Sequence, residues 1–127
     1  MKRILLASLL SLGLLCTAQA AVISVNFAGG NSSSSTGGGD GQALVGAGTA
    51  GAVPVANWND AVGTGGGGGF SPLALVDDMG AAIGASVSWS TSNTWSTSGP
   101  TGTPDQNLMK GYLDNFGGQS FNVTGLP

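Results

Sequence analysis

The sequence contains no histidine and no glutamate, and its single cysteine is Cys16. A Ser-His-Asp or Cys-His catalytic centre therefore has no base, and a zinc site would have to be built from aspartates alone. Two aspartates could in principle serve a glycosidase, one as acid and one as base or nucleophile. The adjacent Asp77 and Asp78, however, would face opposite sides of a strand. We expect a protein that is not an enzyme.

Positive charge is almost missing as well. Lys2, Arg3 and Lys110 are the only cationic residues, against six aspartates. Residues 21–127 keep one lysine and all six aspartates, a net charge of −5. Such a chain cannot neutralise a row of phosphates, which argues against nucleic acid and anionic membrane surfaces as partners.

The one long apolar run lies at the N-terminus. A basic start is followed by an apolar stretch over residues 4–15 and by Ala-Gln-Ala at 18–20, where a signal peptidase requires small residues. The stretch is too short to span a bilayer. The pattern predicts a cleavable signal peptide over residues 1–20 and a single secreted or cell-surface domain over residues 21–127. That domain would have lost Cys16 with its leader and would hold no disulfide and no transmembrane segment.

Glycine is abundant instead, with 24 residues clustered mainly at 37–41, 46–51 and 63–69. Glycine loses more backbone freedom on ordering than any other residue, so these clusters predict loops. The sequence GAGTAG at 46–51 matches a dinucleotide-binding fingerprint, which works only where a helix follows. Pro54 and the polar residues after it argue against a helix at this point, and we interpret residues 46–51 as a loop.

Short segments with alternating polar and apolar residues lie between the loops. The clearest strands are 21–27, 82–90 and 120–124, and weaker candidates are 43–45, 52–56 and 73–76, with a turn at 77–80. In the first strand, Val25 and Phe27 are expected to face the core and Asn26 the solvent. In the second, the odd-numbered residues up to Trp89 are expected to point inward.

One segment has helical spacing. Asp105 is expected to cap a turn that carries Leu108, Met109, Tyr112 and Leu113, although Gly111 weakens it. No long amphipathic helix is present in the sequence. Short strands between Gly, Ser, Thr and Pro loops predict an all-β fold, as an antiparallel β-sandwich or jelly roll.

The aromatic residues suggest carbohydrate binding. Trp58, Trp95 and Tyr112 lie beside Asn or Asp in the sequence, and a flat aromatic ring can pack on a sugar ring while amides bond its hydroxyls. We therefore select Asn57, Trp58, Asn59 and Trp95 as carbohydrate-binding candidates, with an extracellular polysaccharide or a cell-surface component as the partner. The alternative is that each tryptophan belongs to the core, where its large area would stabilise so small a domain.

The aspartates suggest calcium as a ligand, because this ion prefers oxygen atoms. The candidate calcium ligands are Asp60, Asp77, Asp78 and Asp105, all on expected loops or turns. The alternative is that they occupy turns because their side chains bond nearby backbone amides.

Several segments carry a family resemblance: VISVNF (22–27), VPVANWND (53–60), GASVSW (84–89), NTW (93–95), LMKGYLD (108–114) and VTGLP (123–127). Together with the leader they resemble the N-terminal part of secreted bacterial proteins with PEP-CTERM sorting tails, of the planctomycete and verrucomicrobial type. In that family a strand rich in Tyr and Val follows Gly-Leu-Pro. This chain lacks that strand and the sorting tail, so we expect it to be the N-terminal part of a longer sandwich.

The resemblance implies a β-sandwich similar to carbohydrate-binding modules, exported to the cell surface or extracellular matrix. Residues and resemblance together predict an exported protein with a structural or binding role and no catalysis of its own. The alternatives are a secreted carbohydrate-binding module and, third, a fragment of a glycan-active enzyme.

Overall fold

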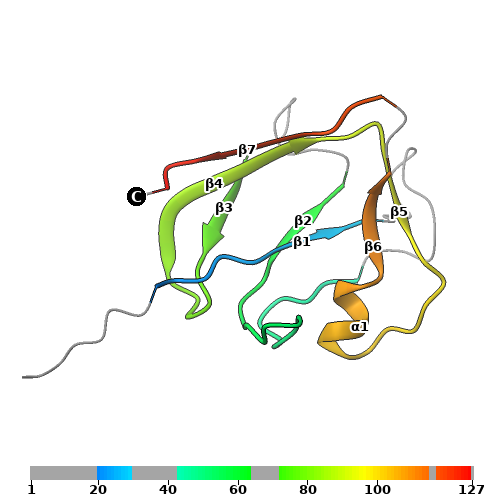
Figure 1. Cartoon of the computed structure of the whole chain (residues 1–127), viewed down its shortest axis with the longest axis horizontal. Coiled ribbons are helices and arrows are strands. Elements are labelled where there is room, and N and C mark those ends of the chain that lie inside the picture. The colour runs from blue at the N-terminus through cyan, green and yellow to red at the C-terminus, as the bar shows by residue number, and fades with distance from the viewer. Residues whose placement is uncertain (1–19, 30–42, 64–71, 115–116, 127) are drawn as a thin grey trace, which may run out of the picture.

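The structure, a computed structural model, describes residues 20–29, 43–63, 72–114 and 117–126 (Figure 1). Its elements are β1 (Val25–Ala28), β2 (Asn59–Val62), β3 (Leu73–Val76), β4 (Ala82–Ser90), β5 (Asn93–Ser96), α1 (Pro104–Leu108), β6 (Gly111–Asp114) and β7 (Ser120–Thr124). The predicted all-β fold is confirmed. The expected signal peptide lies outside the described residues except for Ala20. No helix within the described ranges is long and apolar enough to cross a membrane.

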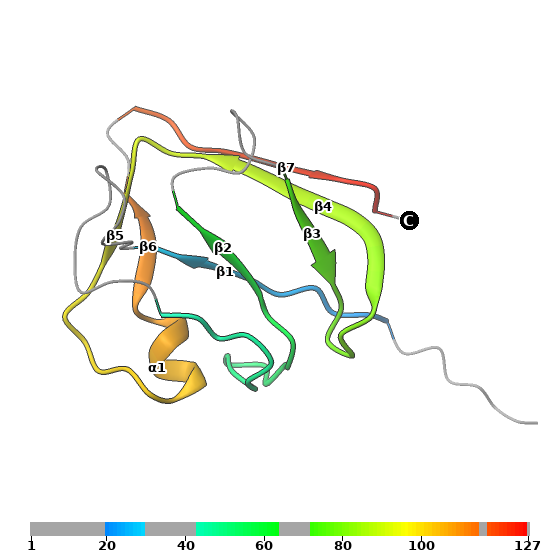
Figure 2. The ribbon, with the colours of Figure 1, turned by 180° about the vertical axis from the view of Figure 1, so that it is seen from behind.

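The described strands form three small sheets. One has the order β3-β4-β7 and another pairs β5 with β6, and both are antiparallel as predicted. The β1–β2 pair differs, because its strands are parallel. Parallel neighbours need a crossover of a dozen or more residues, and residues 29–58 provide that length. Figures 1 and 2 show β4 and β7 along one side of the molecule, β1 and β2 in the middle, and α1 at the opposite side.

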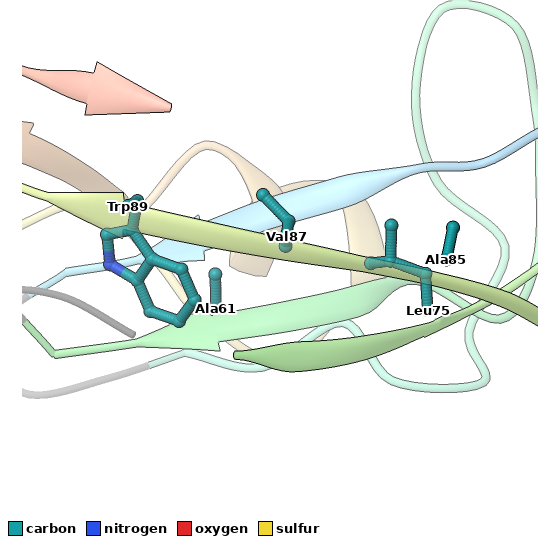
Figure 3. Close-up of a cluster of buried hydrophobic side chains, with 5 residues drawn as sticks. All are labelled: Ala61, Leu75, Ala85, Val87 and Trp89. Atoms are coloured by element: carbon teal, nitrogen blue, oxygen red, sulfur yellow. The ribbon is translucent and has the colours of Figure 1, made fainter. Parts of the chain in front are cut away.

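The core lies between the β3-β4-β7 sheet and the β1–β2 pair. Its buried cluster consists of Ala61, Leu75, Ala85, Val87 and Trp89 (Figure 3). Three of these come from β4, so the predicted inward face of that strand is confirmed. Phe27 of β1 packs edge-on against the Trp89 ring with 6.0 Å between centroids. Aromatic pairs favour such edge contacts over stacked faces.

Strand predictions agree with the structure best where the alternation is regular. Residues 73–76, 82–90 and 120–124 are strands with the predicted bounds. The first strand begins later than predicted, at Val25, and Asn26 is buried rather than facing solvent. Residues 43–45 form no strand. Residues 52–56 form none either, because residues 51–54 are a turn closed by one bridge between Ala50 and Val55.

The helical prediction is partly wrong. Helix α1 begins after Thr103, whose side chain accepts a hydrogen bond from the Gln106 N–H while the Gln106 side chain accepts from the Thr103 N–H. Thr103, rather than Asp105, is therefore the N-cap. The helix ends at Leu108, and Tyr112 and Leu113 belong to β6, because pairing with β5 takes over at Gly111.

Candidate functional site

Asn59 is a structural residue at the start of β2. Its Nδ2 donates to the carbonyl oxygens of Val76 (2.9 Å) and Ser24 (3.0 Å), and its Oδ1 accepts from the Val76 N–H (2.9 Å). The side chain is buried. These bonds use both ends of the amide to join β2 to β3 and to the chain before β1, which leaves no group of Asn59 facing a ligand.

Asn57 and Trp58 also make bonds within the fold. Asn57 has a left-handed backbone (φ 55°), and its Nδ2 donates to the carbonyl of Asp78 (2.8 Å). Trp58 is half-buried, and its Nε1 donates to the carbonyl of Val55 (3.0 Å). Both residues brace the loop before β2, and the indole lies beside Gly51.

The carboxylate of Asp60 organises the same region from the other face of β2. Its Oδ1 accepts from Asn26 Nδ2 (2.7 Å) and from the Val45 N–H (3.0 Å), and its Oδ2 accepts from the Gly46 N–H (2.8 Å). Carboxylates that accept backbone amides form strong, charge-assisted hydrogen bonds. Asp60 thus joins β1, β2 and the segment 43–46.

The other calcium candidates lie apart from Asp60 and accept from backbone amides as well. Asp77 accepts from the N–H groups of Met79 and Ala81, Asp78 from that of Val22, and Asp105 from that of Gly51. Among the described residues, no three acidic, histidine or cysteine side chains form a group that could hold a metal. Asp77 bonds to amides two and four residues further along the chain, as in a turn. Asp60 lies in β2 rather than in the expected loop, and Asp60, Asp78 and Asp105 bond to amides distant in sequence.

Trp95 and Tyr112 form an exposed aromatic pair. They are direct cross-strand neighbours in the β5–β6 ladder, and each keeps over two fifths of its surface exposed, 43% and 44%. Side chains alternate along a strand, so the neighbouring Thr94 and Ser96 are buried on the opposite face. The outward face of β5–β6 therefore presents two adjacent aromatic side chains.

A polar pair lies beside the aromatic pair on the same face. Asn93 is the cross-strand neighbour of Asp114, two residues from Trp95 and Tyr112, and its Nδ2 lies 3.4 Å from Asp114 Oδ2. The hydroxyl of Thr91 donates to the carbonyls of both residues at 3.0 Å. Asn93 Oδ1 is itself buried and has no hydrogen-bond partner among the described residues, so the acceptor atoms that this pair can offer to a ligand belong to Asp114. We call Asn93, Trp95, Tyr112 and Asp114 the β5–β6 face.

Two glycines allow the opposite, buried face of the β5–β6 pair to pack closely against β1. A Cβ added at Gly111 would lie 2.3 Å from the Gly29 nitrogen, and one added at Gly29 would lie 2.3 Å from the Trp95 oxygen and 2.4 Å from the Tyr112 oxygen. The backbones of β1 and β6 can approach so closely only because neither residue has a side chain.

A hollow of about 320 Å³ lies between β1, β6 and β7, and Tyr112 is the member of the β5–β6 face that lines it. Its lining includes Phe27, Tyr112, Leu113, Gln119 and Phe121, from β1, β6, β7 and the segment before β7. Tyr112 therefore borders both the outward face and this hollow. The volume lies at the lower end of the range that small-ligand sites occupy.

Comparisons with protein-family models, curated proteins and solved structures find no match for this chain.

Of the four carbohydrate candidates, the structure leaves only Trp95 on an open face. The sequence prediction grouped Trp95 with Asn57, Trp58 and Asn59, which lie in another part of the fold. The sequence prediction did not include Asn93 and Asp114 among the candidate residues. No alternation in hydropathy was available to find them, because Thr94 and Ser96 on the buried face of β5 are as polar as Asn93 on the open face.

Proposed function

We propose that the chain is an exported protein of the cell envelope or extracellular matrix, with a structural or binding role and no catalysis of its own. Its leader pattern supports export. The observation that carries the non-catalytic role is the use of Asp60, Asp77, Asp78 and Asp105, each of which accepts backbone N–H groups. Carboxylates bonded in this way stabilise loops.

Export is tested by producing the full chain with a C-terminal tag and sequencing the N-terminus of the protein found outside the cytoplasm. We expect a new N-terminus at Ala21. A chain that stays in the cytoplasm and keeps its first twenty residues would contradict the proposal.

The second candidate is carbohydrate binding, now at the β5–β6 face rather than at Trp58. The specific observation is that Trp95 and Tyr112 are adjacent, exposed and flanked by the Asn93–Asp114 pair. The aromatic rings would cover the apolar face of a pyranose, and the Asp114 carboxylate and Asn93 Nδ2 would bond its hydroxyls, since Asn93 Oδ1 is buried. Extracellular polysaccharide is the partner class with this chemistry.

Binding to a panel of insoluble polysaccharides tests this candidate. Removal of a central aromatic residue from an interface commonly costs about 2 kcal/mol, so Trp95→Ala or Tyr112→Ala should weaken binding about 30-fold. Trp58→Phe is the matched control, because it keeps an aromatic ring at a residue that the proposal does not use. Equal weakening by all three variants, or no binding by the parent chain, would refute it.

A further inference from the structure

Strand β7 is an edge strand. It pairs with β4 in the sheet of order β3-β4-β7, and the described residues provide no strand at its second edge. Figures 1 and 2 both show β7 on the outer side of β4. All five of its residues are exposed. Within the described ranges, the outer edge of β7 therefore has no strand paired with it.

This edge has none of the usual protection against pairing. Proteins protect edge strands with charged side chains, proline or bulges. Residues 117–126 contain no charged residue and no proline, and the β4–β7 register runs without a shift. Large apolar side chains are exposed here as well: Phe121 at 52%, Val123 at 46% and Leu126 at 55%.

The two faces of β7 have opposite character. Phe121 and Val123 lie opposite Trp89 and Val87 of β4, on the face toward the core. The other face carries only small or polar residues. Hydroxyl pairs link the two strands on that face, Ser86 with Thr124 at 3.1 Å and Ser90 with Ser120 at 2.7 Å. The partner that fits this edge is a neutral strand with the same alternation.

We propose that this partner is β7 of a second copy, paired antiparallel about a two-fold axis at Asn122. The sequence of β7, Ser-Phe-Asn-Val-Thr, has a polar–apolar pattern that is symmetric about Asn122. In this register Phe121 lies opposite Val123 of the second copy and Ser120 opposite its Thr124, so like faces meet. The two sheets become one of six strands, and the half-exposed Phe121 and Val123 gain an apolar neighbour. The contact is isologous, which is the commonest symmetry of soluble dimers.

The symmetric register is tested by cross-linking through residue 122. In an antiparallel pair, directly opposite Cα atoms are about 4.5–5.5 Å apart, within the range that a disulfide spans. The full chain is made with Cys16→Ser, so that it has no other cysteine, and with Asn122→Cys. Mild oxidation should link the two copies. The matched control is Ser88→Cys, which lies on the same face of β4 directly opposite Asn122 but one strand further from the axis. It should remain unlinked.

A second, independent test introduces a charge at position 122 of the otherwise unchanged chain. Analytical ultracentrifugation then measures the dimer dissociation constant. Like charges directly opposite each other weaken strand pairing, so Asn122→Lys and Asn122→Glu should each raise the dimer dissociation constant about fivefold. A mixture of the two variants should restore the dimer, because opposite charges then face each other.

A parent chain that stays monomeric at all concentrations would overturn the proposal. A dimer that does not cross-link through Asn122→Cys, and whose dissociation constant does not change when residue 122 is charged, would also overturn it, since that dimer must use another surface.

Discussion

The side-chain amide of Asn59 pairs with the backbone of Val76 as one strand pairs with the next, through one donated and one accepted bond of 2.9 Å each. Strands β2 and β3 share no ladder of their own. One side chain therefore bridges the β1–β2 pair and the β3-β4-β7 sheet at this point.

We expect Asn59→Ala to reduce the free energy of unfolding by about 3 kcal/mol, because a buried polar group without a partner costs about 1–3 kcal/mol and Val76 loses two partners. Urea unfolding followed by circular dichroism measures the change. Ser98→Ala, at an exposed position outside the strands, is the control and should have little effect. If both variants unfold at the same urea concentration, the Asn59 bonds contribute nothing to stability.

The bonds of Asp60 lead to a prediction about calcium. Its carboxylate already accepts from Asn26, Val45 and Gly46, so millimolar calcium should leave the melting temperature unchanged. Asp60→Ala should cost about 2–3 kcal/mol with or without the ion, because three donors lose their acceptor. A melting temperature that rises with calcium in the parent chain and not in Asp60→Ala would show that Asp60 is a ligand.

The close approach of Gly29 and Gly111 predicts that neither tolerates a side chain. Gly29→Ala and Gly111→Ala should each destabilise the fold by about 1–3 kcal/mol, because backbone atoms would have to move to admit the new Cβ. Gly117→Ala is the matched control, since a Cβ there meets nothing within 4 Å. Thermal unfolding compares the three variants. Unchanged stability in Gly111→Ala would mean that β1 and β6 are further apart than described here.

The three tryptophans should differ in their contributions to stability. Trp89 is buried in the core, and Trp89→Ala should cost about 3–5 kcal/mol. Trp95→Ala should stay within about 1 kcal/mol of the parent chain, because its side chain is exposed, and Trp58→Ala should fall between them. Denaturant unfolding measures all three. A large loss in Trp95→Ala would assign that ring to the core and remove it from the binding proposal.

Sequence patterns predicted β4 well and β5 and β6 poorly, for a physical reason. Strand β4 runs for nine residues, and its inward residues from Ala85 to Trp89 are apolar while their neighbours are serines. In β5 the buried residues are Thr94 and Ser96, so the alternation in burial produces no alternation in hydropathy. A strand whose buried face is made of hydroxyl side chains cannot be recognised from apolar periodicity.

The candidate site shows a similar limit. Tyr112 follows Leu108 at a helical spacing, and only the pairing with β5 shows that it belongs to a strand. Asn57, Trp58 and Asn59 look like a binding cluster because they are adjacent. Their side chains instead bond to Asp78, Val55 and Val76, and the sequence does not show which of several carbonyls each will meet.

Contacts between residues far apart in the sequence, such as those of the parallel β1–β2 pair, affect how quickly the chain can fold. Asn26 meets Asp60 across 34 residues, Val22 meets Asp78 across 56, and Ser86 meets Thr124 across 38. Contacts at such separations form late, because a long loop must close before any of them contributes, and folds built from them take milliseconds to seconds. A newly made chain should therefore remain unfolded for an appreciable time, which suits the export proposed above, because a chain can be translocated before it acquires its structure.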